Sequence, residues 1–151
     1  MLSTMLVLAT NAHARQTDKA GKPYILHCLK VMHYLNTEDE ELQCIALGHD
    51  LVEDTDVTYS WLEELGFSGR VIEGIRALTK QQGHSYDEYK EQVFANKDAM
   101  LVKLCDLRHN SDIRRLKGVT DKDIARIRKY HQFYLEIQER LLQFGERNEA
   151  R

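Results

Sequence analysis

The octet Gly48-His49-Asp50-Leu51-Val52-Glu53-Asp54-Thr55 concentrates charge in a segment that is otherwise apolar. In a helix its imidazole and its carboxylates would share one polar strip, because His49 precedes Glu53 by four residues and the two aspartates have the same spacing. Carboxylates beside an apolar run are costly to bury unless a cation or a proton compensates them. The octet therefore leaves two interpretations, a divalent-metal site or an acidic helix end that turns into solvent.

Length and composition are those of an ordinary globular domain. The chain has 151 residues, of which 42% are hydrophobic and 30% are charged, and its net charge is −3. We expect one domain over residues 1–151, large enough for a real core. One proline and eight glycines are few chain breakers for this length, which favours helices. The negative net charge offers no basic field, so nucleic acid is not an expected partner.

Cysteine usage and hydropathy bear on the compartment. The cysteines are odd in number and far apart, at Cys28, Cys44 and Cys105, and no CxxC motif is present. This pattern predicts neither a disulfide framework nor a zinc site, and it fits a cytoplasmic protein. Residues 1–14 lack the basic start of a signal peptide and are predicted as an amphipathic helix. No segment is long and apolar enough to span a bilayer, so no membrane partner is expected.

Helical spacing and cap residues recur along the chain. Ser3, Thr58 and Ser68 are predicted N-caps, and Ser85 with Glu88 has the spacing of a capping box. No stretch alternates with period two, so the sequence predicts an all-α helical bundle. The expected helices cover approximately residues 3–14, 23–35, 38–54, 85–95, 97–116 and 121–144, with two short helices after Thr58 and Ser68.

The expected helix over 97–116 carries a second anomaly. Its centre is apolar nearly all round, which predicts burial, yet Lys103, Asp106 and Asn110 form a polar stripe at spacings of three and four. Either Lys103 and Asp106 form an internal ion pair, or Asp106 completes a metal site with a His and an Asp from elsewhere. The residues alone leave both interpretations open.

The histidines differ in context. His27 lies at the start of an expected helix, and His49 lies in the octet. His13 faces the core side of the first expected helix and is a candidate hydrogen-bond donor to the site. The others have no carboxylate-rich context and are predicted as surface or packing residues: His33, His84, His109 and His131.

Four motifs in register carry a resemblance to a known family. They are Ala12-His13-x-x-Gln16, Gly21-Lys-Pro-Tyr-Ile-Leu-His27, the octet, and Val102-Lys-Leu-Cys-Asp-Leu-Arg-His-Asn110. The set resembles, in order and spacing, the hydrolase domain of RelA/SpoT homologues, which belongs to the HD metal-dependent phosphohydrolases. The resemblance runs over most of the chain and implies a single HD-type helical domain with enzymatic activity.

The resemblance also implies the site residues. The implied ligands of a Mn²⁺ ion are His27, His49, Asp50 and Asp106. A metal ion held by such ligands activates water and polarises a phosphoryl group. Of the implied catalytic pair, Glu53 would take the proton of the attacking water or orient it, and Asp54 would position that water or Glu53. The implied reaction removes the 3′-pyrophosphate of guanosine tetra- or pentaphosphate, (p)ppGpp, the alarmones of the stringent response, giving GDP or GTP and pyrophosphate.

Substrate contacts rest on fewer signals. Lys19 occupies the position that contacts the nucleotide base in relatives, and Arg15 and Lys103 are weaker candidates for contacts to the phosphates or the base. Asn110 would donate to the ribose or to water at the metal. Solvated surface charge is the alternative for each cation. Where the long enzymes of the family carry two adjacent basic residues, this chain has Asp18-Lys19, so its preference for guanine stays open.

Three functional alternatives follow. The expected function is (p)ppGpp hydrolysis by a stand-alone small alarmone hydrolase, paired in the cell with a small alarmone synthetase. The same metal site would suit adenosine alarmones or another phosphorylated nucleotide. The third alternative is a non-catalytic module that has kept the fold and binds a nucleotide, and the intact ligand positions and the Glu53–Asp54 pair argue against it. No feature of the sequence predicts the oligomeric state.

Overall fold

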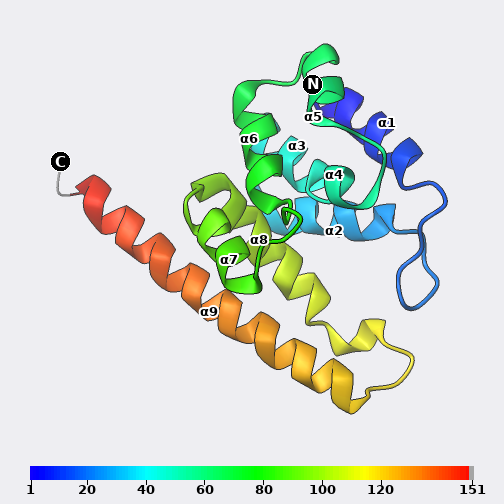
Figure 1. Ribbon diagram of the computed structural model, residues 1–151, viewed down its shortest axis with the longest axis vertical. Helices are drawn as coiled ribbons and strands as arrows, with labels where there is room; N and C mark the ends of the chain where they lie inside the picture. Colours follow the sequence, from blue (N-terminus) through cyan, green and yellow to red (C-terminus); the bar gives the residue numbers. More distant parts are fainter. Residues whose placement is uncertain (150–151) are drawn as a thin grey trace.

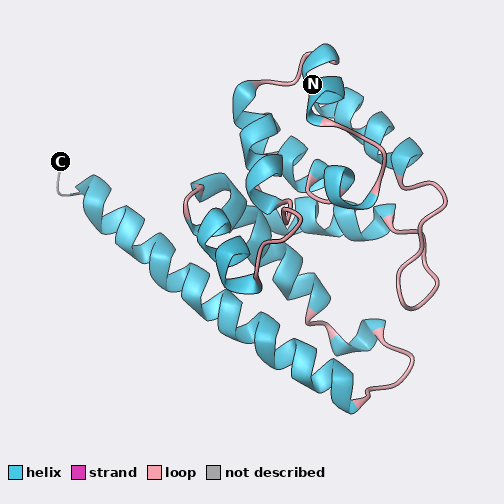
Figure 2. Ribbon diagram, viewed as in Figure 1, coloured by secondary structure: helices cyan, strands magenta, loops and turns pink. Residues whose placement is uncertain are grey.

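The fold is described by a computed structural model that covers residues 1–149, with side chains to residue 145, so the last two residues of the expected domain lie outside the described range. The described residues form no strand, which confirms the predicted all-α class (Figure 2). The helices are α1 (Leu2–Ala12), α2 (Ile25–Leu35), α3 (Glu40–Gly48), α4 (Leu51–Asp54), α5 (Tyr59–Glu64), α6 (Gly69–Leu78), α7 (Tyr86–Phe94), α8 (Lys97–Asn110) and α9 (Asp121–Glu149), with a 3₁₀ turn, η1 (Ile113–Arg115), before the last.

Helix α3 lies at the centre of the bundle. It packs against α1, α2, α6 and α8, and α8 in turn packs against α2, α7 and α9 (Figure 1). Helix α9 extends as a long arm along α7 and α8. Few polar residues are buried in this bundle, and His27, His49 and Asp106 are among them. The apolar side chains that fill the core and expose no surface include Met5, Ile45, Leu47, Ile75, Met100 and Phe133.

Several helices begin where their local sequence predicts. Thr58 and Ser68 each accept a hydrogen bond from the backbone N–H three residues on, at the starts of α5 and α6. Ser85 and Glu88 form the predicted capping box of α7. These caps work because each side-chain oxygen satisfies a backbone donor that has no partner within its helix.

The start of α1 is instead held by another helix. The predicted cap at Ser3 is wrong, because α1 already begins at Leu2 and Ser3 lies inside its first turn. Glu40, at the start of α3, accepts a hydrogen bond from the Leu2 N–H at 2.7 Å. Its carboxylate also complements the positive end of the α1 dipole.

The helix expected over residues 38–54 is divided into α3 and α4. The break lies at His49 and Asp50, where Asp50 has φ −104° and ψ 0°. This region of backbone conformation is sparsely populated and holds many active-site residues. The Asp54 N–H still donates to the Asp50 carbonyl at 2.9 Å, so α4 follows at once. The polar residues of the octet therefore do not form the single strip of one straight helix.

The last third of the chain departs from expectation in its helix bounds. Helix α8 ends at Asn110 rather than near residue 116, because Asp112 begins η1 by accepting from the Arg114 N–H at 3.1 Å. Helix α9 begins at the expected place after Thr120 and continues past the expected end near residue 144. None of the described helices combines the length and the apolar character that crossing a membrane requires.

Helices α3 and α6 approach closely at Gly74. A Cβ atom built there lies 2.5 Å from Cδ1 of Ile45 and 2.8 Å from its Cγ1. We expect Gly74→Ala to lower the free energy of unfolding by about 1–3 kcal/mol, the usual cost of overpacking a core. Gly69→Ala, in the same helix with no atom within 4 Å of its added Cβ, is the matched control. Urea unfolding compares them, and equal stabilities would contradict this close packing.

Candidate metal centre

Four polar side chains from three separate segments meet in the core. His27 comes from α2, His49 and Asp50 from the break between α3 and α4, and Asp106 from α8. Nε2 of His27 lies 3.0 Å from Oδ1 of Asp106. Nε2 of His49 lies 3.0 Å from Oδ2 of Asp50. Each imidazole also approaches the other carboxylate, at 3.5 and 3.9 Å. The structure thus brings the four predicted ligands together.

The chemistry of these groups fits a divalent metal ion. Nδ1 of His49 lies 2.6 Å from the Ala46 carbonyl, which only accepts, so Nδ1 carries a proton and donates it. Nε2 of His27 and Nε2 of His49 are buried and make no hydrogen bond. Ligand atoms of His27, His49 and Asp50 lie within 4.8 Å of one another. Imidazole nitrogens and carboxylate oxygens in one buried cluster suit a divalent transition metal.

The carboxylates of this cluster call for a positive charge beside them. Burial tends to lower the pKa of His49, but the charges of Asp50 and Asp106 outweigh it and raise that pKa well above its usual range. Burial tends to raise the pKa of Asp50, but the charge of His49 and the hydrogen bond from Tyr24 bring it to about 2. Both carboxylates therefore stay ionised, and either a proton on His49 or a metal ion balances them.

Tyr24, in the loop before α2, forms a hydrogen bond with Asp50. Its hydroxyl donates to Oδ2 of Asp50 at 2.5 Å, and its ring lies 5.2 Å from that of His13 and 5.3 Å from that of His27. Burial and the charge of Asp50 raise the pKa of Tyr24, so the hydroxyl remains a donor. Tyr24 was not among the predicted site residues. Its place in the motif that ends at His27 is the signal that pointed to it.

Asp106 is held on both oxygens by residues of its own helix. Nζ of Lys103 lies 2.8 Å from Oδ2, and Nδ2 of Asn110 donates to Oδ1 at 2.8 Å. Burial tends to lower the pKa of Lys103, but Asp106 raises it well above its usual range, so the ammonium stays charged. Oδ1 of Asp106 also faces the histidines. Asp106 can therefore pair with Lys103 through Oδ2 and bind a metal ion through Oδ1. The structure therefore places Lys103 and Asn110 beside the cluster, already engaged by Asp106.

Glu53 and Asp54 lie on α4 and are more exposed than the histidines. Oε1 of Glu53 accepts from the Lys80 N–H at 2.8 Å. Oδ2 of Asp54 accepts from Nε2 of Gln16 at 3.1 Å, and Oε1 of Gln16 lies 2.7 Å from Nδ1 of His13. Partial burial, with Asp50 nearby, raises the pKa of both carboxyl groups.

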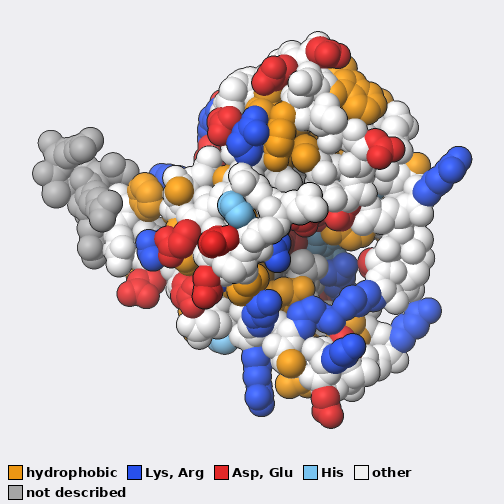
Figure 3. Space-filling model, viewed as in Figure 1, with side chains coloured by type: hydrophobic (Ala, Val, Ile, Leu, Met, Phe, Trp, Pro, Cys, Tyr) orange, Lys and Arg blue, Asp and Glu red, His pale blue; other side chains and the backbone are white. Residues whose placement is uncertain are grey.

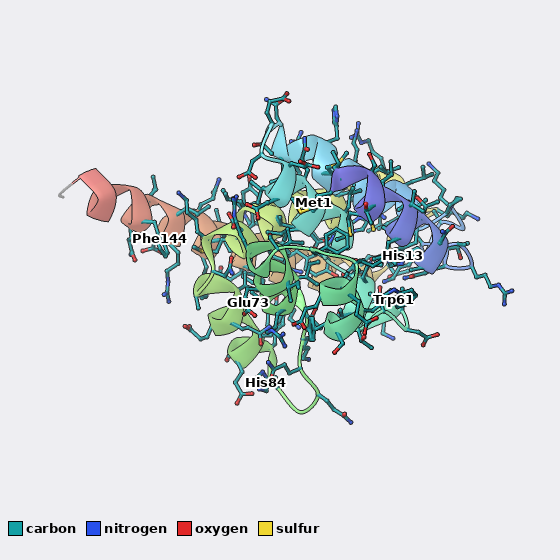
Figure 4. All side chains as sticks on the ribbon, turned by 90° about the horizontal axis from the view of Figure 1, so that it is seen from above. Met1, His13, Trp61, Glu73, His84 and Phe144 are labelled. Carbon is teal, nitrogen blue, oxygen red and sulfur yellow. The ribbon has the colours of Figure 1, made fainter. Side chains whose placement is uncertain are left out.

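Gln16 links His13 to this site by hydrogen bonds. It follows the C-terminal end of α1 (Figure 4) and is almost completely buried. Because Gln16 accepts from His13 with its oxygen, the amide nitrogen is directed toward Asp54. His13 is therefore a hydrogen-bond donor, as expected, but it donates to Gln16, and it is Gln16 that donates to the carboxylate of Asp54.

His109 lies against the other nitrogen of His27. The two Nδ1 atoms are 2.7 Å apart, and the rings lie side by side in nearly parallel planes, with centroids 5.0 Å apart. Burial and the neighbouring charge of Arg115 lower the pKa of His109 to about 4. His109 was predicted as a surface or packing residue; it does pack beside His27, and its Nδ1 also contacts that of this candidate ligand. Its position three residues after Asp106 on one helix was the available signal.

A cavity of about 290 Å³ opens beside the cluster. Tyr24 and Asn110 line it and connect it to the cluster through their bonds to the two aspartates. Lys19 also lines this cavity, as its predicted role requires, whereas Arg15 is exposed and does not. Figure 3 shows Lys and Arg side chains gathered around a hollow in this face of the molecule. The basic residues that line the cavity are Lys19, Arg115 and Arg126.

Asp18 shapes the loop that carries Lys19. Its Oδ1 accepts from the backbone N–H groups of Ala20 and Lys22, each at 2.9 Å. Its Oδ2 lies 3.4 Å from Nη2 of Arg115 across the cavity wall. The acidic residue that departs from the family pattern therefore fixes the loop and offsets one of the cavity's cations.

Sequence comparison finds relatives of known family. No protein-family model matches the chain. It is 33% identical over 131 residues to a probable guanosine-3′,5′-bis(diphosphate) 3′-pyrophosphohydrolase of Synechocystis, covering 79% of this chain and 17% of that protein. It is 33% identical over 117 residues to the bifunctional (p)ppGpp synthase/hydrolase SpoT of Escherichia coli K12, covering 69% of this chain and 16% of that protein.

A solved structure matches over nearly the whole length of both chains. It is described as a metazoan ortholog of SpoT that hydrolyses ppGpp, and it superposes with a TM-score of 0.72 at 25% identity, covering 95% of each chain. The chain belongs to the HD-type hydrolase domains of the RelA/SpoT family. The expected HD-type helical fold is thereby confirmed. This RelA/SpoT-type domain spans less than a fifth of the length of the curated relatives named above.

Proposed function

We propose that this domain is a metal-dependent enzyme that hydrolyses the 3′-pyrophosphate of (p)ppGpp-type alarmones, giving GDP or GTP and pyrophosphate. The observation that carries the proposal is the meeting of two imidazoles and two carboxylates in the core, next to a cavity lined by cations. A nucleotide with phosphates on both sides of its ribose needs cations along the cavity and a metal ion at the scissile bond. The activities named for the relatives support the same substrate.

Mn²⁺ is the proposed ion, with His27, His49, Asp50 and Asp106 as its ligands. Mixed nitrogen and oxygen donors suit divalent ions of this kind. When bound, the ion would supply Lewis-acid chemistry, activating water and polarising the phosphoryl group. Lys103 and Tyr24 would keep the carboxylates ionised and oriented, because each engages one oxygen of a ligand.

Glu53 is the proposed acceptor of the proton from the attacking water. Burial and the neighbouring carboxylates raise its pKa, which brings the group closer to the range useful for proton transfer near neutral pH. The Lys80 N–H fixes one of its oxygens and leaves the other for water. The water oxygen forms a bond to the phosphorus that is attached to the ribose 3′ oxygen. The bond between this phosphorus and the 3′ oxygen breaks, pyrophosphate leaves, and the 3′ oxygen takes up a proton to become a hydroxyl group.

Asp54 is the proposed positioning group for this water or for Glu53, and Gln16 fixes its side chain. We expect Gln16→Ala to lower kcat by about fivefold, because it removes one orienting hydrogen bond, worth about 1 kcal/mol. The Mn²⁺ affinity should not change, since Gln16 contacts none of the proposed ligands. Steady-state kinetics and a Mn²⁺ titration test this, with the exposed Gln82→Ala as control. A loss of metal affinity as large as the loss of kcat would contradict it.

The substrate contacts follow from the cavity. Lys19 is proposed to contact the base, and Asn110 the ribose or water at the metal, because both line the cavity. Lys103 would add positive charge near the 3′ phosphates from beside Asp106. Arg15, exposed beyond the cavity, is proposed as an outer contact to the phosphates.

Adenosine alarmones are the second candidate substrates. Asp18 favours them, because it stands where the long enzymes of the family have a basic residue and it offsets the charge of Arg115. With one free cation fewer, the loop would bind the guanine base less strongly and discriminate less between guanine and adenine. The same metal centre would act on either purine, since the scissile bond is identical.

A panel of nucleotides separates these candidates. The chain with Mn²⁺ is incubated with ppGpp, pppGpp, their adenosine counterparts, and ordinary nucleoside phosphates, and the release of phosphate and of pyrophosphate is measured. We expect pyrophosphate from guanosine 3′-pyrophosphates. Turnover of another phosphoester while 3′-pyrophosphates are ignored would contradict the proposal. Stoichiometric Mn²⁺ without hydrolysis of any nucleotide would favour a binding module.

The cellular setting is part of the same proposal. We propose a cytoplasmic enzyme built as one domain, because the helices of residues 1–149 share a core and the cysteines at 28, 44 and 105 are free thiols. Its action would oppose that of a small alarmone synthetase, since a hydrolase of alarmones needs a source of them.

A further inference from the structure

The Nδ1 atoms of the two candidate histidine ligands have different hydrogen-bond partners. Nδ1 of His49 faces the Ala46 carbonyl, which can only accept a hydrogen bond. Nδ1 of His27 instead faces Nδ1 of His109 at 2.7 Å. Because an imidazole nitrogen either donates or accepts, the tautomer of His27 depends on which of the two rings supplies the proton.

Resting on the proposed metal centre, we propose that His109 is a positioning residue that accepts a hydrogen bond from Nδ1–H of His27 and leaves Nε2 of His27 free to bind the metal ion. The opposite arrangement would put the proton of His27 on Nε2. That atom is buried and makes no hydrogen bond, although Oδ1 of Asp106 lies 3.0 Å away. A proton there would be a buried donor without an aligned acceptor, which native structures rarely contain.

His109 is itself held in place. Its ring lies beside that of His27 with an interplanar angle of 20°, and the ring of Tyr34 meets it edge-on with centroids 6.1 Å apart. Its carbonyl accepts from Nη1 of Arg115 at 3.0 Å. The contact joins α2 to the last turn of α8, the helix that also supplies Asp106. Partners of this kind orient metal-binding imidazoles and raise their basicity.

Three variants of the full chain separate hydrogen bonding from ring packing. His109→Phe keeps a ring beside His27 and removes the acceptor, whereas His109→Asn offers an amide oxygen as a new acceptor. His33→Phe, exposed on the same helix as His27, is the matched control. The Mn²⁺ affinity of each is measured by competition with a chelating indicator, and thermal unfolding checks that each variant is folded.

The expected result is a loss of affinity that follows the acceptor. His109→Phe should bind Mn²⁺ about 10–100-fold more weakly than the wild type, and His109→Asn should recover most of that loss. The control should match the wild type. Equal affinities for wild type and His109→Phe would overturn the proposal, as would equal losses for the Phe and Asn variants.

A second measurement needs no variant. In the wild-type chain loaded with diamagnetic Zn²⁺, nitrogen-15 chemical shifts should place the proton of His27 on Nδ1 and that of His109 on Nε2. A proton on Nδ1 of His109 would overturn the proposal. A chain that binds no divalent ion would overturn the metal centre and this role together. Intact metal binding without alarmone hydrolysis would overturn only the proposed substrate, and the affinity series would still support His109.

Discussion

Replacing Asp106 with alanine is expected to abolish Mn²⁺ binding and alarmone hydrolysis together. Oδ1 of Asp106 lies 3.0 Å from Nε2 of His27 and 3.5 Å from Nε2 of His49, so the variant loses the carboxylate that both imidazoles face. Removing a residue that only hydrogen-bonds to a metal ligand costs about 10–100-fold in metal affinity. Removing a ligand itself should therefore cost more than about 100-fold. Equilibrium Mn²⁺ titration and pyrophosphate release measure the two effects.

The alanine variant also leaves Lys103 without its partner. Nζ of Lys103 lies 2.8 Å from Oδ2 of Asp106, and removing one member of a buried pair costs about 3–5 kcal/mol. Asp106→Asn is therefore the companion variant, because an amide keeps the shape and can accept from Lys103 but lacks the charge. The exposed Asp56→Asn is the matched control. A folded Asp106→Asn protein with wild-type Mn²⁺ affinity would show that Asp106 is not a ligand.

Replacing Glu53 should have the opposite pattern, with metal binding retained and hydrolysis lost. Glu53 contacts the Lys80 N–H and none of the proposed ligands. If it accepts the proton from the attacking water, Glu53→Ala and Glu53→Gln should each lower kcat by about 10²–10⁴-fold, the usual contribution of a general base. Glu64→Gln, exposed on α5, controls for the change of charge. Loss of Mn²⁺ binding in the Glu53 variants would make Glu53 a ligand and contradict this assignment.

The meeting of the four candidate ligands could be predicted from the sequence because they are carried by short motifs with fixed spacing. His27, His49 and Asp106 are polar residues inside apolar runs, which predicts both their burial and their need for partners. The capping box at Ser85 was equally accessible, since it depends only on neighbouring residues. Signals that are local in the sequence therefore led to the right elements.

Contacts between distant segments account for what the sequence did not show. Ser3 has the right residue type for a cap, but Glu40 from another helix holds the start of α1. The break after α3 places Asp50 within hydrogen-bond distance of the hydroxyl of Tyr24, which lies in the loop before α2. The partner of His109 lies on another helix, so its role depends on α2 packing against α8. Each of these pairings is tertiary, and no local pattern specifies it.

The central claim is that this metal centre releases pyrophosphate from a nucleotide 3′ position, and product analysis tests it most directly. The purified chain is incubated with ppGpp and Mn²⁺, beside the Asp106→Asn variant, and the products are separated and identified. We predict GDP and pyrophosphate in equal amounts from the wild type and none from the variant. Unchanged ppGpp with the Mn²⁺-loaded wild type, or release of single phosphates instead of pyrophosphate, would contradict the claim.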